Sequence, residues 1–281
     1  MPLLSPTACR TVADNLDHPE GVAFGPDGNL YTGGEAGQVF RIRSDGSGAV
    51  EYANTGGGIG GIALDAAGNL YECNYGNFRV NKVTPDGQVS VYSAGTEALP
   101  AVYPNYPVFD RAGNLYYTDS GDFDRVNGRL YVVRPDGKTE VLIPGFLHFP
   151  NGLAIDPENE WLYVVQSSAS NILRMRLRDG GLGDPELYAT LPGTVPDGIA
   201  LAESGNLYVA CYAPDAISVV APDRAVEVVV ADDRAMVINR PTNVAFGPHD
   251  TDLYFANLGG FHIGAVSVGE RGAPLHYPEL P

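Results

Sequence analysis

One phrase recurs six times along the chain, and it constrains the fold more than any other feature. A small residue is followed by alternating apolar residues, a turn and an apolar–Tyr pair. The copies are PEGVAFGPDGNLY from Pro19, GGIALDAAGNLY from Gly60, PNYPVFDRAGNLY from Pro104, PNGLAIDPENEWLY from Pro150, PDGIALAESGNLY from Pro196 and PTNVAFGPHDTDLY from Pro241. Repeats of about 40–50 residues are typical of propeller blades, each a four-stranded sheet. The chain is therefore predicted to be all-β, a six-bladed β-propeller.

Each copy predicts the same strand order. Two strands lie within the phrase, a third follows it, and Asp-Gly turns at 45–46, 136–137 and 179–180 lead toward a fourth. Five copies have that fourth strand, whereas the sixth ends at GAVSVGERGAPLHYPELP without one. We expect residues 9–16, CRTVADNL, to complete the last blade, because an N-terminal strand there closes the ring and covers a sheet edge. Residues 1–281 then form a single propeller domain.

Two other all-β architectures fit less well. A parallel β-helix would repeat every 20–30 residues or so, and a β-sandwich would not repeat six times.

The composition excludes several classes of partner. The formal net charge is −17, and no cluster of Lys and Arg is present to bind nucleic acid or an anionic membrane. We expect no signal peptide, because MPLLSPTACR lacks a charged segment followed by an apolar run, and no membrane span, because no apolar run approaches about 18 residues. Cys9, Cys73 and Cys211 are too irregularly spaced for a disulfide framework or a zinc motif. We expect a cytoplasmic protein that acts on a small-molecule substrate. A monomer is the first expectation for its oligomeric state, and an oligomer is left open.

The repeat places one column of polar residues at the start of an inner strand in each blade. The column reads Glu20, Gly60, Asn105, Asn151, Asp197 and Thr242. Asn, Asp and Gly are ordinary turn residues, so one of them alone would mean nothing, and a set of turns is the plainer interpretation. Glu20, by contrast, is not a turn former, and four oxygen-bearing side chains share this register. Two carboxylates facing each other across a channel repel, however, unless a cation lies between them. Carboxylate and amide oxygens suit Ca²⁺ best; Mg²⁺, Mn²⁺, Fe²⁺ and Zn²⁺ are further candidates. Glu20, Asn105, Asn151 and Asp197 are the predicted metal ligands.

A second column lies three residues after the Tyr of each copy. It reads Gly34, Asn74, Asp119, Gln166, Cys211 and Asn257. Asn74 and Asp119 are candidate substrate contacts, and the alternative is a buried polar network that joins the blades. Tyr75, Tyr103 and Tyr106 are candidates for the apolar wall of a substrate pocket. No role is assigned to His148 or His262.

These motifs resemble the regucalcin/gluconolactonase family (SMP-30/gluconolactonase/LRE-like) of six-bladed calcium propellers, and more distantly diisopropylfluorophosphatase and the paraoxonases. HPEGVAF around Glu20, FPNGLAID around Asn151 and VPDGIAL around Asp197 carry the resemblance. It implies that these three residues ligate the metal, that Asn105 is a fourth ligand or a substrate contact, and that the activity is lactone or phosphotriester hydrolysis. Tyr103 stands where the family has an Arg that contacts sugar lactones, so a less polar ligand is expected.

Three functions follow as hypotheses. The first is a calcium-dependent, lactonase-like hydrolase in which Asp197 and Asn105 are catalytic, with Asp197 as general base or nucleophile. The second is a biosynthetic lyase, isomerase or cyclase on the same scaffold, because fold does not determine chemistry. The third is a non-catalytic, metal-stabilised binding propeller.

Overall fold

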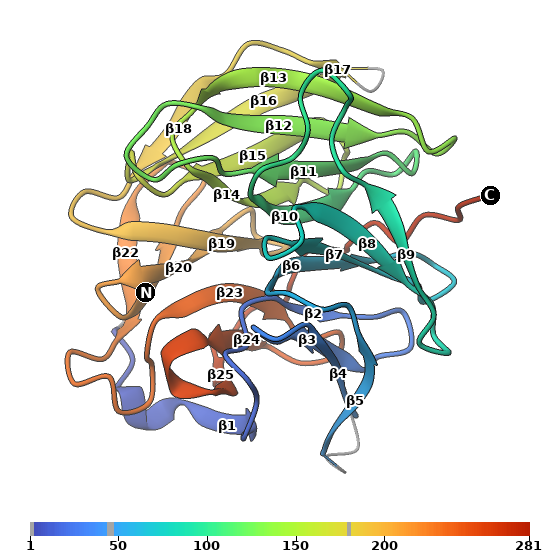
Figure 1. The fold of residues 1–281 in the computed structure, drawn as a ribbon. Coiled ribbons are helices and arrows are strands. Elements are labelled where there is room, and N and C mark those ends of the chain that lie inside the picture. Colours follow the sequence, from blue (N-terminus) through green and yellow to red (C-terminus); the bar gives the residue numbers. More distant parts are fainter. Residues whose placement is uncertain (1–2, 44–47, 179–180) are drawn as a thin grey trace.

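The computed structural model describes residues 3–43, 48–178 and 181–281. Six antiparallel sheets are arranged in a ring, which confirms the predicted six-bladed propeller (Figure 1). In each blade the first strand after the connecting loop is the innermost. Within the described residues the helices are two short 3₁₀ turns, η1 (Pro6–Ala8) and η2 (Leu258–Gly260).

The first three blades each contain four strands in sequence order. They are β2 (Val22–Phe24), β3 (Leu30–Gly33), β4 (Gln38–Ile42) and β5 (Ala49–Asn54); β6 (Ile59–Leu64), β7 (Leu70–Asn74), β8 (Arg79–Val83) and β9 (Val89–Ser93); and β10 (Pro104–Phe109), β11 (Leu115–Asp119), β12 (Gly128–Val133) and β13 (Thr139–Leu147).

The last three blades vary this plan. They are β14 (Pro150–Ile155), β15 (Trp161–Gln166), β16 (Asn171–Arg178), β17 (Gly181–Leu182) and β18 (Glu186–Thr190); β19 (Val195–Leu201), β20 (Leu207–Ala213), β21 (Ala216–Val220) and β22 (Val226–Ala231); and β23 (Pro241–Phe246), β24 (Asp252–Asn257), β25 (His262–Ser267) and β1 (Arg10–Ala13). In the fourth blade both β17 and β18 pair with β16, so that sheet has one more strand than the sequence predicted.

The ring is closed by the N-terminal strand, as predicted. β1 pairs antiparallel with β25, with Arg10 opposite Ala265 and Thr11 opposite Gly264 (Figure 1). The outer edge of β25 is thereby covered, and the two ends of the chain are tied into one sheet.

The predicted hairpin turn at 136–137 is present. Gly137 has φ +85° and donates its backbone N–H to the Arg134 carbonyl oxygen, a conformation that glycine adopts at little cost. The other two predicted turns, at 45–46 and 179–180, fall on positions outside the described residues.

Polar residues of the repeated phrase stabilise the turn that follows an inner strand. In the second blade Asp65 accepts hydrogen bonds from the Asn69 side chain (2.8 Å) and the Tyr71 hydroxyl (3.0 Å). The same acid–Asn–Tyr arrangement recurs in the first and third blades. In the fifth blade the carboxylate comes instead from Glu270, which bonds Asn206 and Tyr208. In these four blades the Asn and Tyr of the phrase therefore bond a carboxylate that caps the turn, whichever part of the chain supplies it.

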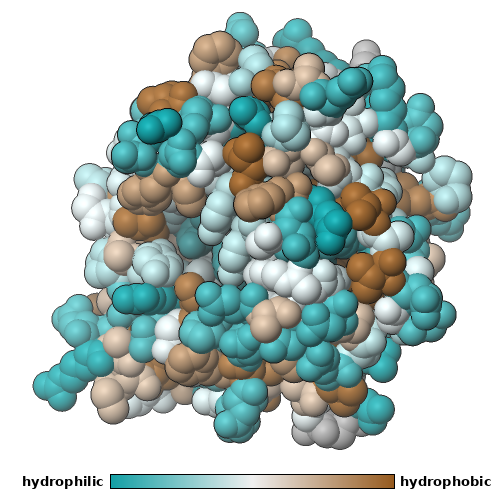
Figure 2. All heavy atoms as spheres, in the orientation of Figure 1, coloured by the Kyte–Doolittle hydropathy of each residue, from teal (hydrophilic) through white to brown (hydrophobic). Residues whose placement is uncertain are grey.

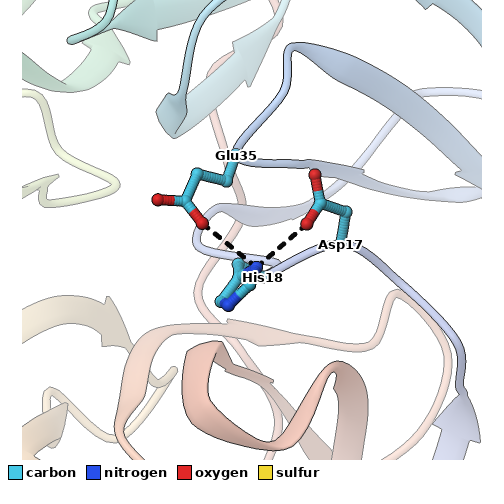
Figure 3. A group of neighbouring side chains, drawn as sticks. All are labelled: Asp17, His18 and Glu35. Atoms are coloured by element: carbon cyan, nitrogen blue, oxygen red, sulfur yellow. Dashed lines mark hydrogen bonds and ion pairs between the residues drawn. The ribbon is translucent and has the colours of Figure 1, made fainter.

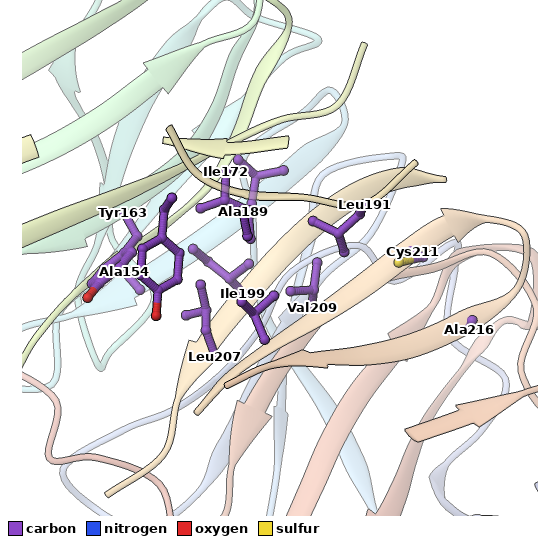
Figure 4. Close-up of a cluster of buried hydrophobic side chains, with 13 residues drawn as sticks. Ala154, Tyr163, Ile172, Ala189, Leu191, Ile199, Leu207, Val209, Cys211 and Ala216 are labelled. Atoms are coloured by element: carbon purple, nitrogen blue, oxygen red, sulfur yellow. The ribbon is translucent and has the colours of Figure 1, made fainter. Parts of the chain in front are cut away.

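The hydrophobic core lies between the blades rather than in the channel. One cluster joins the fourth and fifth blades and includes Tyr163, Ile172, Ile199, Leu207 and Val209 (Figure 4). Equivalent clusters lie between the other neighbouring blades, so burial of apolar surface holds each blade to the next.

The surface is mixed in character. On the face drawn in Figure 2, hydrophobic residues form separate patches among hydrophilic ones. Among the described residues, none of the helices has the length and apolar content that crossing a bilayer requires.

Candidate functional site

The inner strands place the predicted column at the channel. Each of β2, β6, β10, β14, β19 and β23 contacts the inner strands of both neighbouring blades. Five of them have a register shift at the column residue; in β14, for example, pairing skips from Pro150 to Leu153 around Asn151. A β-bulge turns its side chain out of the normal alternation and is often found beside functional sites. The bulges therefore redirect the column side chains.

Adjacent blades approach one another closely at this level. A Cβ on Gly60 would lie 2.6 Å from the carbonyl oxygen of Asn105, and a Cβ on Gly21 would overlap that of Gly60. Glycine at these positions is required by the close backbone approach, which gives Gly60 a packing role in the ring.

Hydroxyl groups fix the backbone on either side of the column. Ser120 donates to the Pro150 carbonyl oxygen (2.7 Å) and Ser167 to that of Pro196 (2.6 Å). Thr118 donates to the carbonyl oxygen of Asn151 at 2.9 Å. Each of these bonds links one blade to the next, so Asn151 and Asp197 are held by the blade that precedes them.

The column side chains carry buried oxygen atoms with no partner. Asn105, Asn151 and Asp197 are buried, and Oδ1 of each lacks a hydrogen bond to any residue that the structure describes. Buried polar atoms are nearly always paired in native proteins. Three unpaired acceptors from three consecutive blades, together with the half-buried carboxylate of Glu20, form an oxygen-rich donor set that fits a hard divalent cation.

Electrostatics show that Glu20 and Asp197 interact. Burial, and then the charge of Glu20, raises the pKa of Asp197 well above its usual range, while a hydrogen bond from Asn151 acts in the opposite direction. Burial, and then the charge of Glu35, raises the pKa of Glu20 to about 8. Two neighbouring carboxyl groups resist being ionised at the same time. A cation between such groups stabilises both as anions.

An aromatic wall borders the donor set. The rings of Tyr75 and Tyr103 are stacked with centroids 5.3 Å apart, and Tyr103 contacts Phe149 at 5.7 Å. Phe123, which is exposed, packs edge-on against Phe149 at 5.1 Å. Burial, and then the charge of Glu20, raises the pKa of both Tyr75 and Tyr103, which places these phenols near the column.

The third tyrosine expected in this wall lies elsewhere. Tyr106 is buried among Tyr116, Leu130 and other residues of the third and fourth blades. A Cβ on Gly61 would overlap its ring. The bulge around Asn105 directs Tyr106 between blades, so only Tyr75 and Tyr103 of the three belong to the aromatic wall.

The second column is buried and hydrogen-bonded to loops. Asn74 donates to Thr55 Oγ1 and to the carbonyl oxygens of Gly56 and Gly57. Asp119 accepts the backbone N–H groups of Val102 and Tyr103.

Other members of the column act on loops in the same way. Gln166 accepts the backbone N–H of His148 and Asn257 that of Asn239, while Asn257 also bonds the His262 ring. These bonds hold the loops that enter the inner strands, as in the network alternative; substrate contact by Asn74 or Asp119 stays a prediction.

One cluster near the column is not predicted by the repeat. His18 Nδ1 lies 2.9 Å from Asp17 Oδ1 and 3.1 Å from Glu35 Oε2 (Figure 3). The hydrogen bond to His18 is the main cause that lowers the pKa of Asp17, against the effect of burial. Asp17 and His18 directly precede Pro19 and Glu20, which is a sequence signal, but Glu35 reaches them only through the fold.

Asn243 is a second residue that the repeat did not single out. It is completely buried, and neither polar atom of its side-chain amide has a partner among the described residues. A Cβ on Gly198, the neighbour of Asp197, would overlap its Oδ1. Four other blades have Gly immediately after the column residue, where the sixth blade has Asn243. This difference between the repeats is the sequence signal that could have identified Asn243.

Comparison with known proteins identifies relatives of this chain. Residues 89–258 match the family model described as the SMP-30/gluconolactonase/LRE-like region, and residues 7–42 match the strictosidine synthase-like N-terminal model. Protein STRICTOSIDINE SYNTHASE-LIKE 8 of Arabidopsis thaliana is 27% identical over 72% of this chain and 62% of its own length. Lactonase drp35 of Staphylococcus haemolyticus is 25% identical over 75% and 71%. The chain thus spans less than two thirds of the first relative.

A solved structure has the same fold. The calcium-binding protein regucalcin from Agrobacterium tumefaciens superposes with a TM-score of 0.80 at 16% identity, covering 97% of each chain.

Proposed function

This chain belongs to the SMP-30/gluconolactonase/LRE-like family, and from that premise we propose that it is a metal-dependent hydrolase of lactones or related esters. The three unpaired buried oxygen atoms of Asn105, Asn151 and Asp197 support this proposal most strongly. Lactonase drp35, a relative aligned over 75% of the chain, supports the reaction class.

Glu20, Asn105, Asn151 and Asp197 would hold the ion, with Ca²⁺ as the first candidate because all four donors are oxygens. When bound, a divalent cation polarises an ester carbonyl and stabilises negative charge that develops on its oxygen.

Asp197 is the proposed general base. Its carboxylate accepts a proton from water as the water oxygen forms a bond to the carbonyl carbon. When the ring C–O bond breaks, the protonated Asp197 returns the proton to the leaving alkoxide oxygen. Asn105, and the amide N–H of Asn151 that does not bond Asp197, would orient the substrate carbonyl. The products are a hydroxy acid and an unchanged enzyme.

The aromatic wall determines which esters fit. Tyr75, Tyr103 and Phe149 present ring faces and edges beside the donors, and such surfaces bind apolar groups. The charges of Asp17 and Glu35 act on Tyr75 and disfavour an anionic substrate beside it. Alkyl, aryl and sugar-acid lactones are all uncharged, so the apolar ring surfaces decide among them. We therefore propose lactones with an alkyl or aryl substituent rather than the polyhydroxylated sugar-acid lactones.

The test compares hydrolysis of an alkyl lactone, an aryl lactone and a sugar-acid lactone with Ca²⁺ and with chelator. Asp197→Asn should lower kcat/KM by at least about a hundredfold. Asp124→Asn, an exposed acid in the third blade, is the matched control and should retain activity.

Product analysis in heavy-oxygen water separates the alternatives. One labelled oxygen in the acid supports hydrolysis. A rearranged product without label would favour a lyase or isomerase, and no turnover together with cation-dependent stability would favour a binding propeller. Activity that survives both chelation and Asp197→Asn contradicts the proposal.

Tyr103→Ala tests the aromatic wall separately. We expect KM for the alkyl lactone to rise about tenfold while kcat changes little, because one stacked ring face contributes on the order of 1 kcal/mol. An equal rise for the sugar-acid lactone would show that the ring has no selective role.

A further inference from the structure

The channel contains a cavity beyond the column, further along the same inner strands. Its volume is about 350 Å³. Val22, Ile62, Leu153, Ile199 and Val244, each two residues after a column position, belong to its wall. The column donors lie outside this lining. Native interiors have few voids larger than a water molecule, so a cavity of this size needs an explanation.

Small side chains leave this space open. The third residue after each column position is valine in the third blade and alanine in the other five. All six residues line the cavity: Ala23, Ala63, Val108, Ala154, Ala200 and Ala245. These residues also belong to, or pack against, the apolar clusters between the blades, so a leucine there would narrow the cavity or crowd those clusters. The recurring alanine of the repeated phrase therefore makes room in the channel.

The C-terminal segment 271–277, here called the strap, forms part of the wall (red in Figure 1). Ala273 donates its N–H to the Leu201 carbonyl oxygen of the fifth blade. His276 Nε2 lies 3.2 Å from the Asp156 carbonyl oxygen of the fourth blade, and the Tyr277 hydroxyl donates to Phe24 of the first blade at 2.9 Å. The strap thus crosses between three blades; a short β-bridge around Gly272 holds it to the fifth blade, and one side-chain hydrogen bond reaches each of the other two.

The cavity wall offers little to a charged ligand. Glu203, Asp250 and Arg271 are exposed to solvent, so their charges lie at the edge. His276 Nε2 and the Tyr277 hydroxyl already bond backbone carbonyl groups. Of the remaining lining, Tyr106 carries a hydroxyl group, and the rest is apolar side chain and backbone.

We propose that this cavity is a second ligand site, which binds a neutral, apolar small molecule that enters past the strap. Its volume lies at the lower end of the range for small-molecule pockets, about 300–1,000 Å³, and such pockets are lined mainly by apolar side chains. A folded peptide segment is too large for it. The ligand is held by contact with the ring of alanines and by exclusion of water. The site is separate from the metal column, so it does not depend on the proposed hydrolase activity.

The probe for the test is the neutral fluorophore N-phenylnaphthylamine, added to the whole protein in chelator. Its fluorescence should rise saturably with one equivalent bound. Ala245→Leu and Ala154→Leu should each weaken binding about tenfold or more, since the added side chain fills the volume. Ala225→Leu, at an exposed position, is the matched control and should bind like the wild type. Anilinonaphthalene sulfonate should bind more weakly, because its sulfonate finds no partner.

Two further variants localise the probe. Tyr277→Phe removes one strap hydrogen bond and should speed association. Tyr103→Ala, in the aromatic wall, should leave the affinity unchanged. Non-saturable fluorescence with the wild type overturns the proposal even if the leucine variants fail to fold. A second outcome also overturns the proposal: Tyr103→Ala loses binding while Ala245→Leu binds the probe normally. The probe would then occupy the metal side of the channel.

Discussion

The Thr242 hydroxyl donates a 2.8 Å hydrogen bond to the backbone carbonyl oxygen of Glu20. This bond joins the last inner strand to the first, between residues at opposite ends of the sequence. It fixes the backbone of one proposed metal ligand through a residue that has no predicted ligand role of its own. Closure of the ring and the shape of the site are therefore coupled at this point.

Thr242→Val should remove that bond while preserving side-chain shape. We expect the free energy of unfolding to fall by about 1–2 kcal/mol, since the Glu20 carbonyl loses a buried donor. Urea unfolding measures the loss. Thr251→Val, whose hydroxyl bonds Ser267 at the surface, should cost less than about 0.5 kcal/mol. Equal losses in the two variants would contradict a special role for the closing bond.

Stability without a divalent cation should depend on pH in a defined direction. Burial and the charge of Glu35 raise the pKa of Glu20 to about 8 in the folded protein. As pH rises from the ordinary glutamate value toward 8, Glu20 ionises in the unfolded chain but resists ionisation in the folded one. The unfolded state then binds fewer protons, so the free energy of unfolding should fall with increasing pH.

Saturating Ca²⁺ should reduce that slope, because the ion stabilises the carboxylate in the folded state. Urea titrations across this pH range, with chelator and with Ca²⁺, measure both slopes. Glu20→Gln should flatten the chelator curve and is the control. Identical curves with and without the ion would argue against a cation at the column.

Asp119→Asn separates a structural from a substrate-binding role. The carboxylate accepts the N–H groups of Val102 and Tyr103 and lies 3.4 Å from Arg129. Its removal should lower stability by about 1–3 kcal/mol while leaving Ca²⁺ affinity intact. Calorimetric titration and urea unfolding test this together. A rise in KM with unchanged stability would instead support direct substrate contact.

Truncation of residues 1–13 should destabilise the whole ring, because it removes β1 and exposes the edge of β25. We expect a loss of cooperative unfolding or a large decrease in the melting temperature. Truncation of residues 1–8 removes η1 but keeps β1 and should have the smaller effect. Comparable melting of the two truncated chains would show that β1 does not close the ring.

Local pattern is enough to predict much of this protein. The spacing of the six phrases predicts the blades, and the missing fourth strand predicts that CRTVADNL completes the last one. Alignment of the phrases with one another puts Glu20, Asn105, Asn151 and Asp197 in a single column. These features can be predicted from the sequence because strand alternation and turn formation depend on residues that are close together in the chain.

Contacts between blades are decided only by the tertiary structure. The fold brings Glu35 to His18, leaves the Asn243 amide without a partner, sends Tyr106 between blades and lays the strap beside the alanine ring. Asn74 and Asp119 look like site residues in the aligned phrases, yet their hydrogen bonds go to the loops that enter the inner strands. Which of two neighbouring faces a side chain reaches depends on bulges and on packing between distant segments. Such information is absent from the periodicity of any one repeat.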